Sequence, residues 1–143
     1  FNAERYQDAE VLIARRNFGC GSCREHAPQS LMRWGIRAIV AESFAEIFFG
    51  NCISLGIPAV TASREDLEKL VETIKADPTA PLTVDIDKKQ LTDGDTTIPI
   101  DMPESARHAL VTGHWDFLSQ LVDNRDAVKT TAEQIPYMAG YAN

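Results

Sequence analysis

Asn-Phe-Gly-Cys-Gly-Ser-Cys-Arg-Glu-His-Ala, residues Asn17 to Ala27, is a polar, glycine-rich segment between two structured patterns. An apolar run ends before it near Ala14, and a helical pattern after it ends at Gly35. A strand, a glycine-rich turn and a helix start in this order present backbone donors and side chains to an anion. The segment therefore predicts a ligand-binding turn.

The residues around this turn predict alternating strands and helices. Continuous apolar runs, typical of strands covered on both faces, occur at residues 9–14, 36–41 and 57–61. Helical spacing follows the second run from Phe44, with Ser43 as the cap and Glu46 closing a capping box, and it follows the third run from Ser63. Such alternation implies right-handed crossovers and a largely parallel sheet.

The second half of the chain has a different pattern. Apolar and polar residues alternate over 82–87 and 97–102, and Asp93-Gly94 between them is a turn signal, which together predict a hairpin. Helices are then predicted from Pro103, over 115–122 and over 126–135. We therefore expect an α/β fold with a mostly parallel sheet core, an appended hairpin and C-terminal helices, in a single domain over residues 1–143.

The composition argues against some classes of function. The 143 residues are 44% hydrophobic, which suits one core, and the formal net charge is −7. An acidic chain argues against nonspecific binding to nucleic acid or to an anionic membrane surface. The sequence has no run of about 18 apolar residues, so we expect no membrane span. Because the sequence starts at Phe1 without a signal-like segment, we expect a trimmed chain.

The turn has two competing interpretations. Ser22 and Glu25 have the spacing of a capping box, which would make the segment an ordinary helix start. That helix would place Pro28 six residues inside, at a cost of about 3 kcal/mol. A separate turn over residues 22–26, with the helix starting near Pro28, avoids this cost and leaves the polar groups for a ligand.

The cysteines leave further alternatives open. Cys20 and Cys23 form a C-x-x-C pattern, as in dithiol redox sites, and a distant Cys52 would complete three thiolates for an iron–sulfur cluster. Cys52 also lies in an apolar helical pattern, where a buried free thiol is usual. An odd number of cysteines favours free thiols in a reducing compartment, and we expect a cytoplasmic protein without a metal site of its own.

The same residues carry a family resemblance. The turn, followed by Gly35-Ile-Arg-Ala-Ile-Val-Ala, Ser43-Phe-Ala-Glu-Ile-Phe and Asn51, resembles the small subunits of 3-isopropylmalate dehydratases, in the aconitase superfamily. The resemblance implies a swivelling β/β/α domain that closes over an active site. It also implies a heterodimer whose large subunit holds a [4Fe-4S] cluster, and dehydration and rehydration of isopropylmalate, a small 2-hydroxy diacid, in leucine biosynthesis. The family's upstream segment, with its substrate-selecting loop, is absent from this sequence.

The resemblance also assigns roles in the turn. Ser22 matches the serine that acts as the base, and Arg24 matches the arginine that binds a substrate carboxylate. Cys23 stands where the family usually has a second serine, and with Gly21 it is expected to contact substrate; the supporting residues are Gly19, Glu25 and His26. Homoaconitase- or citramalate-type dehydratase subunits, and a non-catalytic anion-binding or redox module, are the alternatives.

Overall fold

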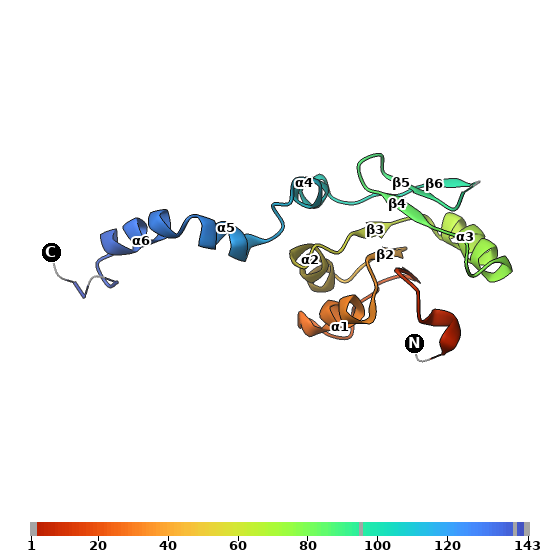
Figure 1. The fold of residues 1–143 in the computed structure, drawn as a ribbon, viewed down its shortest axis with the longest axis horizontal. Coiled ribbons are helices and arrows are strands. Elements are labelled where there is room, and N and C mark those ends of the chain that lie inside the picture. Colours follow the sequence, from red (N-terminus) through yellow and green to blue (C-terminus); the bar gives the residue numbers. More distant parts are fainter. Residues whose placement is uncertain (1–2, 95, 139, 142–143) are drawn as a thin grey trace.

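A parallel three-stranded sheet forms the centre of the body (Figure 1). The computed structural model describes residues 3–94, 96–138 and 140–141. After a short 3₁₀ turn, Glu4–Tyr6, the strands β1 (Val11–Ala14), β2 (Ala38–Ala41) and β3 (Ala59–Thr61) lie side by side in that order, and each neighbouring pair is parallel. All four residues of β2 are buried. The predicted parallel α/β core is confirmed.

The helix after the glycine-rich turn begins at His26. In α1 (His26–Trp34), Pro28 is the third residue, where a missing N–H breaks no intrahelical bond. The helix ends at Gly35, whose φ is 126°. The predicted separate turn is therefore confirmed for residues 22–25, while His26 already belongs to the helix.

Helix α2 (Glu46–Ser54) begins later than its sequence pattern predicts. Its N-cap is Ala45, in an extended conformation and without a side-chain cap hydrogen bond. Ser43 instead pairs with the glycine-rich turn, which keeps the backbone extended up to Ala45. The prediction of a capping box from Ser43 to Glu46 is wrong, because a tertiary contact uses the serine oxygen that the cap would have needed.

Helix α3 (Arg64–Ala76) follows β3 and starts as predicted. The Ser63 hydroxyl oxygen accepts a hydrogen bond from the Asp66 amide at 3.1 Å. This bond satisfies one of the free amides at the helix N-terminus. The helix ends at Asp77, before Pro78.

The predicted hairpin is a three-stranded antiparallel sheet. Its strands are β4 (Thr83–Asp85), β5 (Gln90–Thr92) and β6 (Thr97–Pro99), and Asp93-Gly94 lies in the turn between β5 and β6. Strand β5 escaped the sequence analysis because Leu91 is its only apolar residue, so no alternation is visible there. Thr61 at the end of β3 exchanges backbone hydrogen bonds with Asp101 at 2.7 and 2.8 Å, which joins the two sheets.

The parallel sheet separates two apolar clusters. One lies between the sheets and α3 and consists of buried Val40, Val60, Leu67, Leu70, Leu91, Ile98, Ile100, Met102 and Ala106. The other lies toward α1 and α2 and consists of buried Ile36, Ile39, Phe48, Cys52, Ile57 and Ala59. Adjacent residues Ile39 and Val40 belong to opposite clusters because successive side chains of a strand point to opposite faces. Both faces of the sheet are therefore covered.

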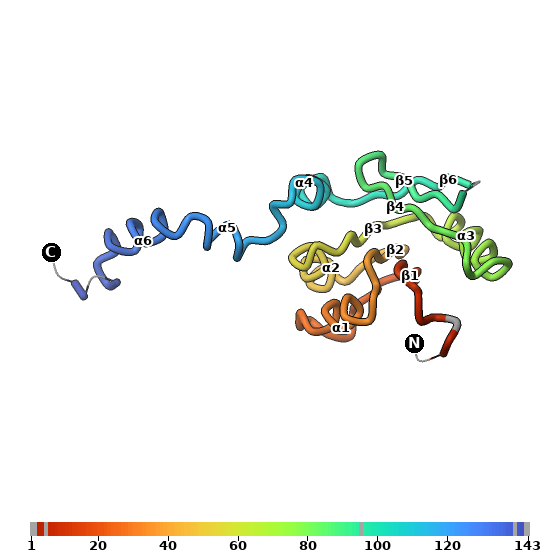
Figure 2. The backbone as a smooth tube through the Cα atoms, in the orientation of Figure 1, coloured from red at the N-terminus to blue at the C-terminus, as the bar shows by residue number. Residues whose placement is uncertain are grey.

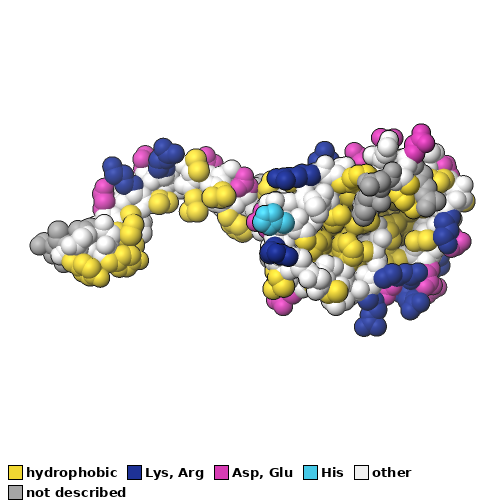
Figure 3. All heavy atoms as spheres, turned by 90° about the horizontal axis from the view of Figure 1, so that it is seen from below, with side chains coloured by type: hydrophobic (Ala, Val, Ile, Leu, Met, Phe, Trp, Pro, Cys, Tyr) yellow, Lys and Arg dark blue, Asp and Glu magenta, His cyan; other side chains and the backbone are white. Residues whose placement is uncertain are grey.

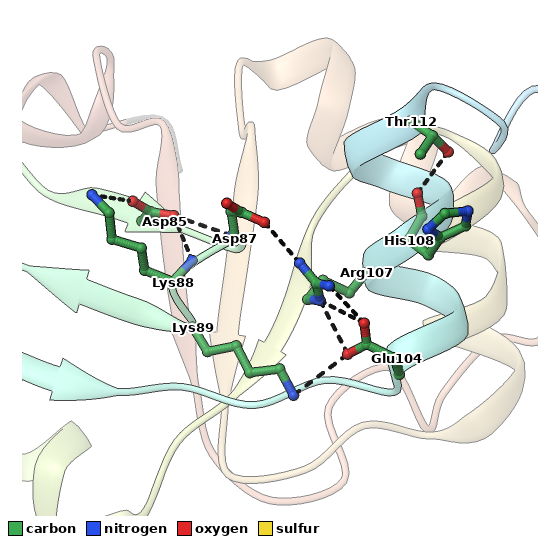
Figure 4. A network of polar contacts seen from close by, with 8 residues as sticks. All are labelled: Asp85, Asp87, Lys88, Lys89, Glu104, Arg107, His108 and Thr112. Atoms are coloured by element: carbon green, nitrogen blue, oxygen red, sulfur yellow. Dashed lines mark hydrogen bonds and ion pairs between the residues drawn. The ribbon is translucent and has the colours of Figure 1, made fainter.

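Helix α4 (Glu104–Thr112) is tied to the turn between β4 and β5 by ion pairs (Figure 4). Half-buried Arg107 contacts Asp87 of that turn at 2.8 Å and Glu104 of its own helix at 2.6 Å. Lys89 adds a weaker contact with Glu104 at 3.8 Å. The hydrogen bonds from Arg107 lower the pKa of the Glu104 carboxyl. The network fixes the point at which the chain leaves the sheets.

Two further helices lead away from the body (Figure 2). They are α5 (Phe117–Asp123) and α6 (Arg125–Gln134), in agreement with the predicted C-terminal helices. Trp115, just before them, packs on Gly56, where an added Cβ would lie 2.8 Å from the indole. We call α5, α6 and the described residues after them the C-terminal arm. Figure 3 shows hydrophobic side chains along this arm.

Candidate functional site

The glycine-rich turn lies at the carboxyl edge of the parallel sheet, where β1 and β2 both end. The Phe18 amide donates to the Ser43 carbonyl oxygen at 2.9 Å, and the Ala45 amide donates to the Phe18 carbonyl oxygen at 2.9 Å. The Asn17 amide also donates to the Ser43 hydroxyl oxygen at 2.8 Å. These bonds extend the β1–β2 pairing beyond the regular strands and hold the start of the turn against the segment that leads into α2.

The two glycines of the turn have different roles. Gly19 has a φ of 84°, and a Cβ there would overlap the ring of Phe48 on α2. Phe18 packs edge-on against the same ring, with centroids 5.3 Å apart. Gly21 is not among the positive-φ residues, and no described atom lies within 4 Å of the Cβ that it lacks. The fold thus requires glycine at position 19 but not at position 21.

Ser22 and Arg24 are joined by hydrogen bonds. The half-buried Ser22 hydroxyl oxygen accepts from the Arg24 backbone amide at 3.3 Å and from its guanidinium Nε at 3.4 Å. Glu25 accepts instead from the Gln29 side chain at 2.7 Å and does not close a box with Ser22. The capping-box alternative for Ser22 is therefore wrong. Donors aimed at the serine oxygen favour negative charge on it.

A small open cleft lies between the turn and the start of α2. It has a volume of about 220 Å³ and is lined by Gly19, Cys20, Ser22, Cys23, Ala45, Glu46, Ile47 and Phe48. Three of the predicted site residues, Gly19, Ser22 and Cys23, meet in its wall. Arg24 borders Ser22 and is exposed, whereas Glu25 and His26 are exposed at the start of α1. Gly21 lies in the turn outside the cleft lining.

A larger open depression of about 520 Å³ lies over α3. It is lined largely by charged residues that pair with one another, including Arg15 with Glu68 at 3.1 Å and Lys75 with Glu72 at 2.7 Å. None of the predicted site residues lines it. The smaller cleft is the better candidate site because it contains the residues with chemistry suited to a substrate.

The three cysteines are free thiols in different surroundings. Cys20 and Cys23 are exposed, whereas Cys52 is buried among the apolar residues of α2, as predicted for a structural thiol. Burial raises the pKa of the Cys52 thiol to about 12, so its thiolate is strongly disfavoured. Within residues 3–94, 96–138 and 140–141, no three His, Cys, Asp or Glu side chains are grouped to hold a metal ion. These thiols do not fit a cluster site.

One contact of the site escaped the sequence analysis. The side-chain amide of Asn51 on α2 donates to the Cys23 carbonyl oxygen at 3.2 Å. In the sequence Asn51 stands out only as a polar side chain within α2 and as part of the family resemblance, and neither signal predicts this contact.

No helix in the described part of the chain has the length and apolar character needed to cross a membrane.

Known proteins with similar sequences indicate the family of this chain. The family described as "Aconitase C-terminal domain" matches residues 1–65. A 3-isopropylmalate dehydratase small subunit from Synechocystis is 46% identical over 138 residues, which cover 96% of this chain and 69% of that protein. A protein of the same name from Thermus thermophilus is 40% identical over 136 residues, which cover 95% of this chain and 68% of that protein.

A solved structure shows the same fold. The crystal structure of 3-isopropylmalate dehydratase from Methanocaldococcus jannaschii aligns with a TM-score of 0.59 and 27% sequence identity, and it covers 87% of this chain and 69% of that one. The sequence similarity extends over nearly the whole chain and includes the glycine-rich turn. The chain belongs to the family of 3-isopropylmalate dehydratase small subunits.

Proposed function

We propose that this chain is the small subunit of a two-subunit hydro-lyase that interconverts 2-isopropylmalate and 3-isopropylmalate in leucine biosynthesis. Membership of the family supports the reaction class. The single structural observation that carries the proposal is the pairing of Ser22 and Arg24 beside an open cleft. Together they provide a base and a carboxylate clamp, as elimination of water from a hydroxy diacid requires.

Ser22 acts as the base in this proposal. During elimination its oxygen, as the alkoxide, takes the proton from the carbon next to the one that loses hydroxide, and the C–H electrons form the new double bond. Ser22 then carries this proton as a neutral hydroxyl. Rehydration reverses these changes with the hydroxyl on the neighbouring carbon, and Ser22 returns its proton to the carbon that had carried the hydroxyl. The net result is that the hydroxyl has moved and no atoms are gained or lost.

A serine hydroxyl needs strong assistance to accept this role. A helix N-terminus stabilises a negative charge by at most about 2 kcal/mol, which lowers a pKa by roughly 1.5 units. This is far too little to deprotonate a serine hydroxyl near neutral pH. The Arg24 amide and Nε add donors directly to the Ser22 oxygen. Closure of the cleft would strengthen these interactions by removing water.

Arg24 binds a carboxylate of the substrate in this proposal. Within its guanidinium, Nε is bonded to Ser22, and no described residue bonds the four N–H groups of its terminal nitrogens, so these can bind a carboxylate. The arginine is exposed beside the cleft, so a substrate can reach it. Cys23 and Gly21 are proposed to contact the substrate mainly through their backbone amides, while Gly19, Glu25 and His26 support the turn.

The proposal includes a large subunit. We propose that this subunit holds a [4Fe-4S] cluster, which would supply Lewis-acid chemistry for the departing hydroxyl. The C-terminal arm supports such a partner, since it exposes Phe117, Leu118, Leu121, Val122, Val128, Tyr137, Met138 and Tyr141, with exposed fractions of 46% to 78%. This apolar surface is on the order of 900 Å², similar to one side of a standard interface.

We place the assembly in the cytoplasm, where the exposed Cys20 and Cys23 stay reduced.

Reconstitution tests the proposal. The chain is assayed alone, with a cluster-loaded large subunit, and with the large subunit plus the Ser22→Ala chain, on 2-isopropylmalate, citramalate and homoaconitate. Turnover of isopropylmalate only in the complete mixture supports the proposal. Activity of the chain alone would contradict the need for a partner, and preference for citramalate or homoaconitate would assign the chain to a different dehydratase.

A further inference from the structure

The peptide unit between Cys23 and Arg24 is held from both sides. Its carbonyl oxygen, on Cys23, accepts a hydrogen bond from the Asn51 side-chain amide at 3.2 Å. Its N–H, on Arg24, donates to the Ser22 hydroxyl oxygen at 3.3 Å. A trans peptide is planar, and its C=O and N–H point in opposite directions. Fixing the carbonyl therefore fixes the direction in which the amide meets Ser22.

Asn51 is well placed to hold the Cys23 carbonyl group in a fixed direction. It lies on α2 one turn after Phe48 and immediately before Cys52, and both of these neighbours are buried in the core. The turn itself is largely exposed at Cys23 and Arg24, so its own packing does not restrain this peptide. The rigid helix is thus connected to the turn through the Asn51 side chain.

The hydrogen bond also defines the chemistry that position 51 needs. A carbonyl oxygen can only accept, so its partner must donate, and the Asn51 NH₂ does so. An aspartate at this position would have nearly the same shape but only acceptor oxygens, and it would repel the Cys23 carbonyl. The Asn51→Asp variant therefore removes the hydrogen-bond donor while keeping nearly the same side-chain packing.

We propose that Asn51 is a positioning residue for the dehydratase reaction. By holding the Cys23 carbonyl, it directs the Arg24 amide at the Ser22 oxygen and keeps this oxygen ready to accept a proton. This inference rests on the proposed function of Ser22 as the base. Asn51 acts through the backbone and does not touch the substrate in this role.

The test uses the chain assembled with its large subunit and compares Asn51→Asp, Asn51→Ala and the control Ser54→Ala. Ser54 lies on the same helix and donates to the Gly50 carbonyl at 3.1 Å, so its variant also removes one side-chain-to-backbone bond. We expect kcat to fall about 10- to 100-fold in both Asn51 variants, with a smaller change in KM. The control should keep wild-type turnover.

A double-mutant comparison distinguishes positioning from general support of the fold. If Asn51 acts through Ser22, adding Asn51→Asp to Ser22→Ala lowers the residual turnover by less than about twofold. If it only supports the fold, the two losses multiply. The amide signal of Arg24 in an NMR spectrum of the ¹⁵N-labelled chain provides a readout without activity, and it should shift in Asn51→Asp but not in Ser54→Ala.

The outcomes separate this inference from the proposed function. Wild-type kcat in Asn51→Asp, or multiplied losses in the double variant, together with an inactive Ser22→Ala enzyme, would overturn the role of Asn51 and leave the base in place. Wild-type turnover of Ser22→Ala would overturn both. Variants with unchanged thermal unfolding, reduced kcat and a shifted Arg24 amide establish the positioning role.

Discussion

The hydroxyl oxygen of Ser22 accepts two hydrogen bonds from Arg24, one from its backbone amide at 3.3 Å and one from its guanidinium Nε at 3.4 Å. The proposed base and the proposed carboxylate clamp are therefore physically linked. Substrate binding at the terminal nitrogens of Arg24 would also orient the Nε that faces Ser22. This linkage makes separate predictions for the two residues.

Replacing Ser22 by alanine should lower kcat by about 10²- to 10⁴-fold, the usual contribution of a positioned base. KM should change less than about threefold, because Arg24 still binds the carboxylate. The measurement is steady-state kinetics with saturating large subunit. Ser30→Ala is the control, since the Ser30 hydroxyl donates to the Ala27 carbonyl within α1, away from the cleft. Near wild-type turnover of Ser22→Ala would remove Ser22 from the base role.

Replacing Arg24 by lysine should raise KM more than it lowers kcat. Lysine keeps the positive charge but loses the planar fork that binds a carboxylate through two hydrogen bonds. We expect kcat/KM to fall by about 10- to 100-fold, equivalent to roughly 1.4–2.7 kcal/mol. Arg33→Lys on the exposed side of α1 is the matched control. Equal effects of the two substitutions would contradict a specific role for Arg24.

Alanine at Gly19 should lower the stability of the fold, whereas alanine at Gly21 should leave the stability unchanged and lower turnover. Gly19→Ala combines a positive φ with overlap on Phe48, and we expect it to reduce the free energy of unfolding by about 2–4 kcal/mol. Gly21→Ala meets no described atom and should change stability by less than about 0.5 kcal/mol. If substrate approaches the backbone at Gly21, its alanine variant should still lose turnover. Urea unfolding and kinetics on both variants decide this.

Polar substitutions on the C-terminal arm should weaken binding of the large subunit. Leu118 and Leu121 are 75% and 58% exposed, so changing both to glutamine removes little packing within the chain. We expect thermal unfolding of the free chain to stay unchanged and the dissociation constant of the heterodimer to rise at least tenfold. Thr131→Gln, on the exposed face of α6, is the control. Unchanged affinity in calorimetric titration would place the interface elsewhere.

The buried thiol predicts a specific pH dependence of stability. The pKa of Cys52 is about 12 in the folded chain and near 9.0 without burial. The contribution of this thiol to the free energy of unfolding is complete below pH 9. It is lost as the pH rises toward 12, because in this range the Cys52 thiol ionises in the unfolded chain but not in the folded one. The stability difference between wild type and Cys52→Ala should shrink by up to about 1.4 kcal/mol per pH unit. Parallel pH profiles of the wild type and the Cys52→Ala variant would contradict this prediction.

The positions of several elements could be predicted from local sequence. Apolar runs located the three parallel strands, and Gly35 and the Ser63 cap located helix ends. These signals work because strand burial, capping and helix termination depend on residues close together in the chain. Local reasoning also placed Pro28 outside a helix interior, which made Ser22 and Arg24 available as ligand groups.

Other features depended on which distant segments meet. Ser43 has the sequence pattern of a helix cap, but the Asn17 amide, 26 residues away, occupies its oxygen. Strand β5 has only one apolar residue and forms through its pairing with β4 and β6. The first case depends on a hydrogen bond between distant segments, and the second depends on pairing with the two strands that flank β5 in the chain, so the residues of the element itself decide neither.

The sequence by itself determined the alternating α/β core, the exposed turn and the two residues proposed for chemistry. Only the tertiary structure placed Asn51, 28 residues from Cys23 along the chain, against the carbonyl that orients the Arg24 amide. Local propensities describe which conformation a segment favours on its own. The direction of a peptide group in an exposed turn is set by its partner across space, and that partner is known only once the helix and the turn have packed together.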